Sequence, residues 1–307
     1  MKFLLTAINA KFIHSNPAIY SLRAGVGEKL QPYVELAEFT INESLESILE
    51  GIWKRQPKVI GFSCYIWNWK LIREILTELP KILPDTEIWL GGPEVTYDGP
   101  GLLREFPQVT GIMVGEGEVT FREVLDHYVR EAESTGQSEQ QPEPDSIEQQ
   151  AADRTGTVAG KNVAERFGQI SGLCLASGYT APRELTDLTT LPFLYEDMEP
   201  FTNRIIYYET SRGCPYRCSY CLSSIDKKVR LRDIDVVKRE LQFFLDQNVK
   251  QVKFIDRTFN CDHKHAMEIW EYIYKHDNGV TNFHFEISAD ILREEEIALL
   301  IRFRPGL

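Results

Sequence analysis

The sequence predicts an α/β protein built from two series of alternating strands and helices. Short apolar runs alternate with longer amphipathic runs from residue 1 to about residue 130, and the alternation returns from residue 204 onward. Residues 133–165, between the two series, contain almost no large apolar side chains. At 307 residues the chain exceeds a typical domain of roughly 150 residues, so we expect two domains.

The first series predicts a doubly wound, Rossmann-like domain over residues 1–131. Strands that alternate with amphipathic helices are typical of a parallel sheet covered on both faces. The doubly wound fold is the simplest arrangement of such a series. The predicted strands are residues 2–8, 34–40, 58–66, 87–92 and 111–117, and the predicted helices are residues 18–30, 43–55, 68–83 and 118–132.

Residues 132–200 predict an acidic, disordered insertion followed by an interdomain bridge. Residues 131–165 contain eight acidic residues and only two basic ones, Arg154 and Lys161. The net charge of this segment is therefore −6, half of the chain's net charge of −12. Such a segment buries too little apolar surface to offset its ordering entropy, so we expect it to be mobile. In the bridge, residues 170–176 predict a hairpin strand and residues 188–201 an extended crossing.

The second series, residues 201–307, predicts about three β/α units. A closed barrel of eight such units takes about 250 residues. Three units cannot close it, so we interpret this region as the first half of a larger barrel and the chain as C-terminally truncated. The predicted strands are residues 204–214, 251–259 and 282–288, and the predicted helices are residues 233–247, 263–276 and 293–303.

Charge and hydropathy exclude two classes of partner. An acidic chain lacks the excess of Lys and Arg that neutralises phosphates, so no nucleic-acid partner is expected. The amino-terminal apolar run is interrupted by Asn9 and Lys11, and no segment approaches 18 uninterrupted apolar residues. We therefore expect no membrane association and a cytoplasmic protein with free thiols.

Three of the six cysteines lie within eight positions of "TSRGCPYRCSYC", residues 210–221: Cys214, Cys218 and Cys221. Closely spaced thiolates suit an iron–sulfur cluster or zinc. A structural zinc site needs four ligands, and here His263 or His265 could complete it. A zinc-stabilised α/β binding protein is therefore one alternative.

The loop resembles the radical S-adenosylmethionine (SAM) superfamily. The resemblance rests on the three-then-two cysteine spacing, on Tyr220 before the last cysteine, and on the position of the loop after the first strand of a β/α series. It implies that Cys214, Cys218 and Cys221 hold a [4Fe–4S] cluster that cleaves SAM reductively. It also implies that Tyr220 lies near the adenine of SAM.

The same resemblance implies further SAM contacts at the ends of the next two strands. Asp256 and Thr258, in "FIDRTFN", are candidates for the SAM amino group. Glu286 and Ser288, in "FHFEISAD", are candidates for the ribose or the carboxylate, because alternate strand residues share a side.

The first domain resembles a cobalamin-binding domain. Its motifs are "GFSCYIWN", "LGGPEVT" and "VGEGEVT", each after a predicted strand. The resemblance implies that Ser63, Gly91, Gly92, Glu116 and Gly117 contact cobalamin. Glycine lets a backbone approach a ligand closely, and open α/β sheets bind ligands at this edge.

Two departures refine the resemblance. Cys64 is the only cysteine in this region, which excludes the second cluster of methylthiotransferases. The loop after the first strand contains His14 without the Asp-x-His-x-x-Gly pattern, so we expect cobalamin without a protein histidine ligand.

The combined resemblance is to cobalamin-dependent radical SAM methylases and the anaerobic magnesium-protoporphyrin monomethyl ester cyclase. It implies an enzyme that performs methyl transfer or radical rearrangement on an unidentified small molecule or peptide, with a one-electron reductant such as flavodoxin or ferredoxin. A truncated, catalytically inert corrinoid-binding module is the second alternative.

Overall fold

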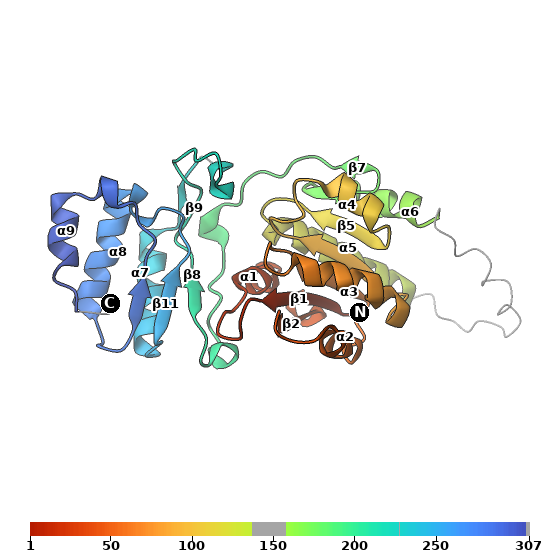
Figure 1. The fold of residues 1–307 in the computed structure, drawn as a ribbon, viewed down its shortest axis with the longest axis horizontal. Coiled ribbons are helices and arrows are strands. Elements are labelled where there is room, and N and C mark those ends of the chain that lie inside the picture. The colour runs from red at the N-terminus through yellow and green to blue at the C-terminus, as the bar shows by residue number, and fades with distance from the viewer. Residues whose placement is uncertain (137–157, 227, 305–307) are drawn as a thin grey trace, which may run out of the picture. The chain divides into compact units, whose positions relative to one another are not determined.

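The computed structural model describes residues 1–136, 158–226 and 228–304, which form two compact units (Figure 1). The first unit comprises Met1–Phe12 and Asn16–Thr186. The second comprises Ile13–Ser15 and the chain from Asp187 onward. The division therefore falls at Thr186, between the predicted boundaries at residues 131 and 200.

The first unit contains a seven-stranded sheet in the order β2-β1-β3-β4-β5-β6-β7. The first five strands in this order are parallel, whereas β6 and β7 pair antiparallel. The reversal of strand order between β1 and β3 is the switch point at which doubly wound sheets bind ligands. The strands are β1 (Phe3–Asn9), β2 (Val34–Thr40), β3 (Val59–Ser63), β4 (Glu87–Gly91), β5 (Val109–Met113), β6 (Leu173–Leu175) and β7 (Gly178–Tyr179).

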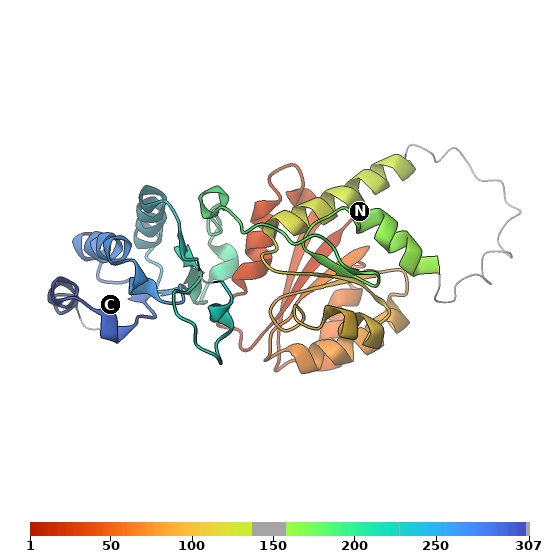
Figure 2. The same cartoon turned by 90° about the horizontal axis from the view of Figure 1, so that it is seen from above.

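Helices cover both faces of this sheet (Figure 2). Buried side chains of α2, α3 and α4 belong to one apolar cluster, and those of α1, α5 and α6 belong to another. The helices are α1 (Pro17–Gly25), α2 (Leu45–Trp53), α3 (Trp69–Ile82), α4 (Gly99–Glu105), α5 (Glu118–Gly136) and α6 (Val158–Phe167).

The alternation of β1 explains the two clusters. Leu4 and Ile8 pack with one cluster, whereas Phe3, Leu5 and Ala7 pack with the other. All seven residues of β1 are buried. A central parallel strand is apolar on both sides because helices cover both faces.

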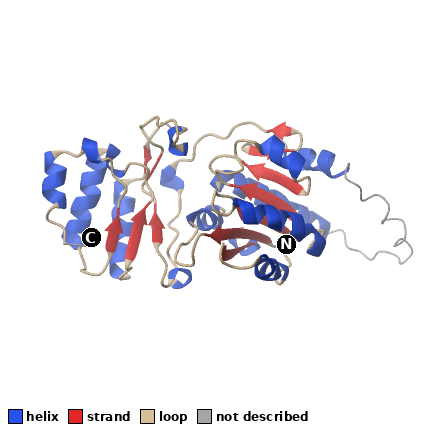
Figure 3. Ribbon diagram, viewed as in Figure 1, coloured by secondary structure: helices blue, strands red, loops and turns tan. Residues whose placement is uncertain are grey.

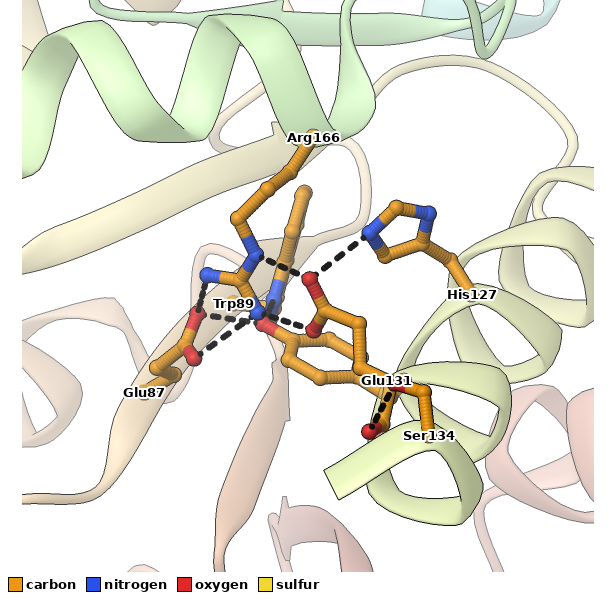
Figure 4. A network of polar contacts seen from close by, with 7 residues as sticks. Glu87, Trp89, His127, Glu131, Ser134 and Arg166 are labelled. Atoms are coloured by element: carbon orange, nitrogen blue, oxygen red, sulfur yellow. Dashed lines mark hydrogen bonds and ion pairs between the residues drawn. The ribbon is translucent and has the colours of Figure 1, made fainter. Parts of the chain in front are cut away.

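Residues 158–165, which composition predicted to be mobile, belong to α6, and residues 133–136 complete α5. Residues 137–157 lie outside the described residues. Arg166 anchors α6 to the sheet through ion pairs with Glu87 on β4 and Glu131 on α5, at 3.0 and 2.7 Å (Figure 4). The adjacent Phe167 is fully buried against Trp89. Charge pairing and one aromatic anchor thus hold this helix on the sheet.

The second unit contains three parallel strands in the order β12-β11-β8, with a helix after each (Figure 3). This confirms the three predicted β/α units. A two-stranded antiparallel ribbon, β9 with β10, follows β8. The elements are β8 (Ile206–Tyr208), β9 (Ser211–Arg212), β10 (Arg230–Leu231), α7 (Ile234–Asp246), β11 (Gln251–Phe254), α8 (His263–His276), β12 (Asn282–His284) and α9 (Glu294–Leu300).

Short 3-10 helices connect these elements. They are η1 (Gln31–Tyr33), η2 (Leu188–Thr190), η3 (Glu199–Phe201), η4 (Leu222–Ser224), η5 (Phe259–Cys261) and η6 (Ala289–Ile291). Within the described ranges, no helix combines the length and apolar character needed to cross a bilayer.

Candidate functional site

The cysteine loop is closed at its base by the ribbon of β9 and β10. Ser211 pairs with Leu231 and Arg212 with Arg230. Gly213 then adopts φ +95°, and a Cβ there would overlap the carbonyl oxygen of Lys228. Only glycine fits this close crossing without strain. The Cys214 N–H donates to the Asp226 carbonyl at 2.9 Å, so the first cysteine lies next to the segment that leaves the loop.

The three cysteines differ in exposure. Cys214 is buried, with its Sγ 3.5 Å from Thr258 Oγ1, whereas Cys218 and Cys221 are exposed. The Cys221 N–H donates to the Cys218 carbonyl at 3.1 Å, which places these two residues in one turn. The structure thus brings Thr258 to the first cysteine and leaves the other two thiols at the surface.

Local hydrogen bonds favour the thiolate of Cys221. The backbone and side chain of Ser223 lower the pKa of this thiol, and the charge of Arg257 lowers it further. A thiolate is the form that binds metal. Across the described ranges, however, no three His, Cys, Asp or Glu side chains converge closely enough to hold a metal ion. Three closely spaced thiols are nevertheless a donor set that suits an iron–sulfur cluster.

Asp256 is a buried residue at the end of β11 and is 1% exposed. It accepts hydrogen bonds from Thr210 N (3.1 Å), Thr210 Oγ1 (2.7 Å) and Ser211 Oγ (2.5 Å). Burial raises the pKa of this carboxyl, and the Ser211 and Thr210 donors oppose the rise. Asp256 thus ties β11 to the segment that enters the cysteine loop.

The end of β12 provides the other two SAM candidates. Glu286 forms an ion pair with Lys253 at 3.1 Å. The Ser288 hydroxyl donates to Asp290 at 2.7 Å, and its backbone pairs with the side chain of Asn260 in both directions, at 2.9 Å each. Sequence analysis missed Asn260, which is fully buried and joins the ends of β11 and β12. The signal in the sequence was a polar side chain directly after the predicted strand of residues 251–259.

A cavity of about 260 Å³ lies beside the cysteine loop. Residues on both sides of the cysteines line it, before Cys214 and after Cys221. Tyr220 points away from the protein and is 91% exposed, and it does not line the cavity. The lining residues are Glu209, Ser211, Arg212, Gly213, Leu222, Ser223, Ile225, Asp226, Ile255 and Arg257. Sequence analysis missed Arg257, although it lies between the candidates Asp256 and Thr258.

The histidines of the zinc alternative have other contacts. His263 Nδ1 lies 2.7 Å from Glu296 Oε1, a fully buried carboxylate. His265 is buried, and burial lowers its pKa. Neither ring joins the cysteines in a group that could hold a metal within the described residues.

In the first unit, Ser63 lies at the carboxyl end of β3, where its Oγ accepts from Asn16 Nδ2 at 3.3 Å. Sequence analysis missed Asn68, which organises the loop that follows. Its amide donates to the carbonyls of Ile8 (3.0 Å) and Ser63 (2.9 Å), and its Oδ1 accepts from Tyr65 N (2.8 Å). This fully buried side chain joins the ends of β1 and β3 at the switch point.

The glycines of the next loop play different parts. Gly92 has φ +110°, and a Cβ there would overlap the carbonyl oxygen of Cys64. The chain's own packing therefore requires this glycine. A Cβ at Gly91 would make only an ordinary contact with Met113 at 3.8 Å, so the backbone there has room beside it.

The loop after β5 has a third glycine. Gly115, which sequence analysis did not select, has φ +81° and open space around the position of a Cβ. Glu116 accepts from Thr186 N at 2.7 Å, and a Cβ at Gly117 would approach Leu22 at 3.0 Å. Of the two glycines in this loop, Gly115 has the more open backbone.

His14 belongs to the second unit, where its Nδ1 contacts the hydroxyl of Tyr207. Its ring therefore takes part in packing next to β8.

Two family models match the chain. The B12 binding domain matches residues 4–125, and the radical SAM superfamily matches residues 208–305. The first match covers the parallel strands of the first unit, and the second begins at the last residue of β8 and includes the cysteine loop.

Three curated relatives are 24–28% identical to the chain over the aligned residues. An uncharacterized methyltransferase of Pyrococcus horikoshii is 26% identical over 74% of this chain and 45% of its own length. The cobalamin-dependent radical SAM methyltransferase TokK of Streptomyces tokunonensis is 28% identical over 66% and 28%. The anaerobic magnesium-protoporphyrin IX monomethyl ester cyclase of Rubrivivax gelatinosus is 24% identical over 86% and 45%. The chain thus spans less than half the length of these relatives.

Solved structures share the fold. The radical SAM methyltransferase TsrM from Kitasatospora setae superposes with a TM-score of 0.65 at 18% identity, over 98% of this chain and 57% of that protein. The cobalamin-dependent SAM radical enzyme OxsB superposes with a TM-score of 0.66 at 16% identity, over 97% and 41%.

Proposed function

Because the chain joins a B12-binding domain to a radical SAM domain, we propose that it is the cofactor-binding part of a cobalamin-dependent radical SAM enzyme. The reaction would be methyl transfer or radical rearrangement on a small molecule or peptide. The observation that carries the proposal is the loop of three thiols at the end of β8, bordered by a cavity.

In this proposal Cys214, Cys218 and Cys221 hold a [4Fe–4S] cluster. When bound, such a cluster supplies the electron that cleaves SAM to a carbon radical. The chain's own contribution is to fix the base of the loop through Gly213 and Asp256, and to favour the thiolate at Cys221. Two exposed cysteines allow the loop to close over the metal.

Cobalamin would bind at the carboxyl ends of β3, β4 and β5. Ser63, Gly91 and Gly115 supply a hydroxyl and two open backbone positions along this edge. Asn68 holds the first of these loops in place.

The remaining site residues keep the roles that the resemblance implies, with two refinements. Thr258 lies beside Cys214 and suits a SAM contact, whereas Asp256 supports the loop from below. Gly92 remains a proposed cofactor contact, and the chain's own packing already requires a glycine at this position. Tyr220, Glu286, Ser288, Glu116 and Gly117 remain proposed cofactor contacts.

The proposed reaction needs a one-electron donor of the flavodoxin or ferredoxin class. It also suits the reducing cytoplasm, since all six cysteines are free and disulfides are rare there.

The test is anaerobic reconstitution of the chain with iron and sulfide, followed by iron analysis, visible absorption and assay of 5′-deoxyadenosine after reduction with SAM. We expect a brown protein with a full cluster per chain, and loss of bound iron in Cys214→Ala, Cys218→Ala and Cys221→Ala. Cys261→Ala is the matched control, because this half-buried cysteine of the same unit lies outside the loop.

Two results would contradict the proposal. Colourless protein carrying one zinc per chain would favour the zinc-stabilised alternative. Cobalamin binding without iron uptake would favour the inert corrinoid-binding module.

A further inference from the structure

Among the described residues that line the cavity beside the cysteine loop, one positive charge has no carboxylate partner. Its lining contains two acidic residues and two arginines. Glu209 pairs with Arg212 at 2.8 Å. Asp226 pairs with Arg230, which lies outside the lining, also at 2.8 Å. With both carboxylates paired, the remaining charge is that of Arg257.

Arg257 makes no hydrogen bond or ion pair with any residue that the structure describes. Its neighbours Asp256 and Thr258 are buried, whereas Arg257 is exposed and lines the cavity. A guanidinium has five donors in a planar fork that matches a carboxylate. The cavity therefore suits a ligand with a carboxylate group.

The position of the cavity indicates which ligand this is. The lining residues flank the first and last cysteines of the loop, so a molecule in the cavity lies next to the proposed cluster. Glu286, the earlier candidate for the ribose or carboxylate of SAM, is an acceptor paired with Lys253 at 3.1 Å, so it supplies no hydrogen-bond donor to a carboxylate.

We propose that Arg257 binds the carboxylate of the methionyl group of SAM. This inference rests on the proposed function and assigns one contact within it. The contact fixes the methionyl end of SAM beside the cysteine loop.

The test compares SAM with decarboxylated SAM by isothermal titration calorimetry on the anaerobically reconstituted chain. A charge-assisted hydrogen bond contributes enough that we expect Arg257→Gln to weaken SAM binding by about 10- to 100-fold. Decarboxylated SAM will bind the parent less tightly, but Arg257→Gln should change its affinity less than about twofold. Arg257→Lys should recover part of the SAM affinity, because it restores the charge without the fork.

Arg217→Gln is the matched control, since Arg217 is an exposed arginine of the same loop that does not line the cavity. It should leave both affinities unchanged. Iron content and visible absorption of every variant should equal those of the parent.

Three results would overturn the assignment. They are unchanged SAM affinity in Arg257→Gln, an equal loss of affinity for both ligands, and loss of iron together with SAM binding. Failure of the parent itself to take up iron or SAM would remove the proposed function as well, so the two failures are distinguishable.

Discussion

Asp256 is the residue on which the entrance to the cysteine loop depends most. Three hydrogen bonds converge on its carboxylate from Thr210 and Ser211, both of which are buried. An acceptor with no replacement leaves its donors unsatisfied, at roughly 1–3 kcal/mol each for buried groups. The stability of variants at Asp256 therefore tests whether this residue supports the loop or contacts SAM directly.

We predict that Asp256→Ala lowers the free energy of unfolding by at least about 3 kcal/mol, because three buried donors lose their acceptor. Asp256→Asn should cost about 1 kcal/mol, since its oxygen can still accept from Thr210 N while the two hydroxyls rotate to accept from its amide. Urea unfolding followed by circular dichroism measures both values.

Asp85→Asn, at an exposed carboxyl of the first unit, is the control for loss of charge and should have little effect. If Asp256→Ala unfolded like the parent but bound SAM weakly, Asp256 would be a direct ligand contact instead.

His265 gives the second unit a predictable response to acid. The residue is buried on α8, and its Nε2 has no hydrogen-bond partner among the described residues. Burial lowers its pKa below 6.5, an effect that Asp262 and Glu268 partly oppose and Lys238 increases. Well above pH 6.5 the ring is neutral in both states and contributes no pH dependence. As pH falls below 6.5 the unfolded chain takes up the proton first, so stability decreases until the pH passes the lower folded pKa.

We predict that the free energy of unfolding of the parent falls more between pH 7 and pH 5 than that of His265→Leu. Urea titrations at each pH measure the difference. The other histidines, including His263 and His276, are present in both proteins, so their contributions cancel in the comparison. Parallel pH profiles would show that the buried ring does not titrate in this range.

At the scale of elements, the loop between β3 and α3 is held by one side chain. Asn68 uses both ends of its amide, donating to two carbonyls and accepting from Tyr65 N. Asp at this position would place a second oxygen against the carbonyls of Ile8 and Ser63, whereas Ala would only leave the groups unpaired.

We predict that Asn68→Ala destabilises the first unit by about 2–3 kcal/mol and that Asn68→Asp costs at least as much. Both variants should also weaken cobalamin binding, measured by absorbance titration, because Ser63 lies in the same loop. Asn16 is a related test, since it contacts Ser63 through one longer hydrogen bond of 3.3 Å, and Asn16→Ala should have a smaller effect on cobalamin. Equal cobalamin affinity in the parent and in Asn68→Asp would show that this loop does not take part in cobalamin binding.

The elements that could be predicted from the sequence are those with a strong period. The five parallel strands and the helices α1, α2, α3 and α5 follow the alternation of apolar and amphipathic runs. Helix α4 was missed because "GPGLLRE" begins with glycine and proline, and its start depends on Asp98 accepting from Gly101 N. Helix α6 was missed because its anchors, Arg166 and Phe167, find their partners far away in the chain.

The candidate site divides in the same way. Cysteine spacing identified the loop, because local spacing carries the information. The burial of Asp256 and the exposure of Arg257 could not be predicted, since which of two adjacent residues faces the interior depends on how β11 pairs with β8. The two-residue ribbon that closes the loop is too short to leave a pattern in the sequence.

At the scale of the whole molecule, each unit has its own core and its own proposed cofactor. Among the described residues, the buried members of the apolar clusters of the first unit end at Cys174 and Leu175. The second unit has a separate core around Phe254, Phe244 and Trp270. A ligand that binds only a folded unit stabilises that unit by mass action.

We therefore predict that the two cofactors protect different parts of the chain in hydrogen–deuterium exchange. Removing iron from the reconstituted protein with a chelator should increase exchange in peptides from residues 210–231, because the exposed turn of Cys218 and Cys221 loses its ligand. Adding cobalamin at about 100 times its dissociation constant should stabilise the first unit by about 2.7 kcal/mol and slow exchange in peptides from residues 59–68. Each treatment should leave the other set of peptides unchanged. Equal protection of both sets by either cofactor would instead show that the units fold and bind as one.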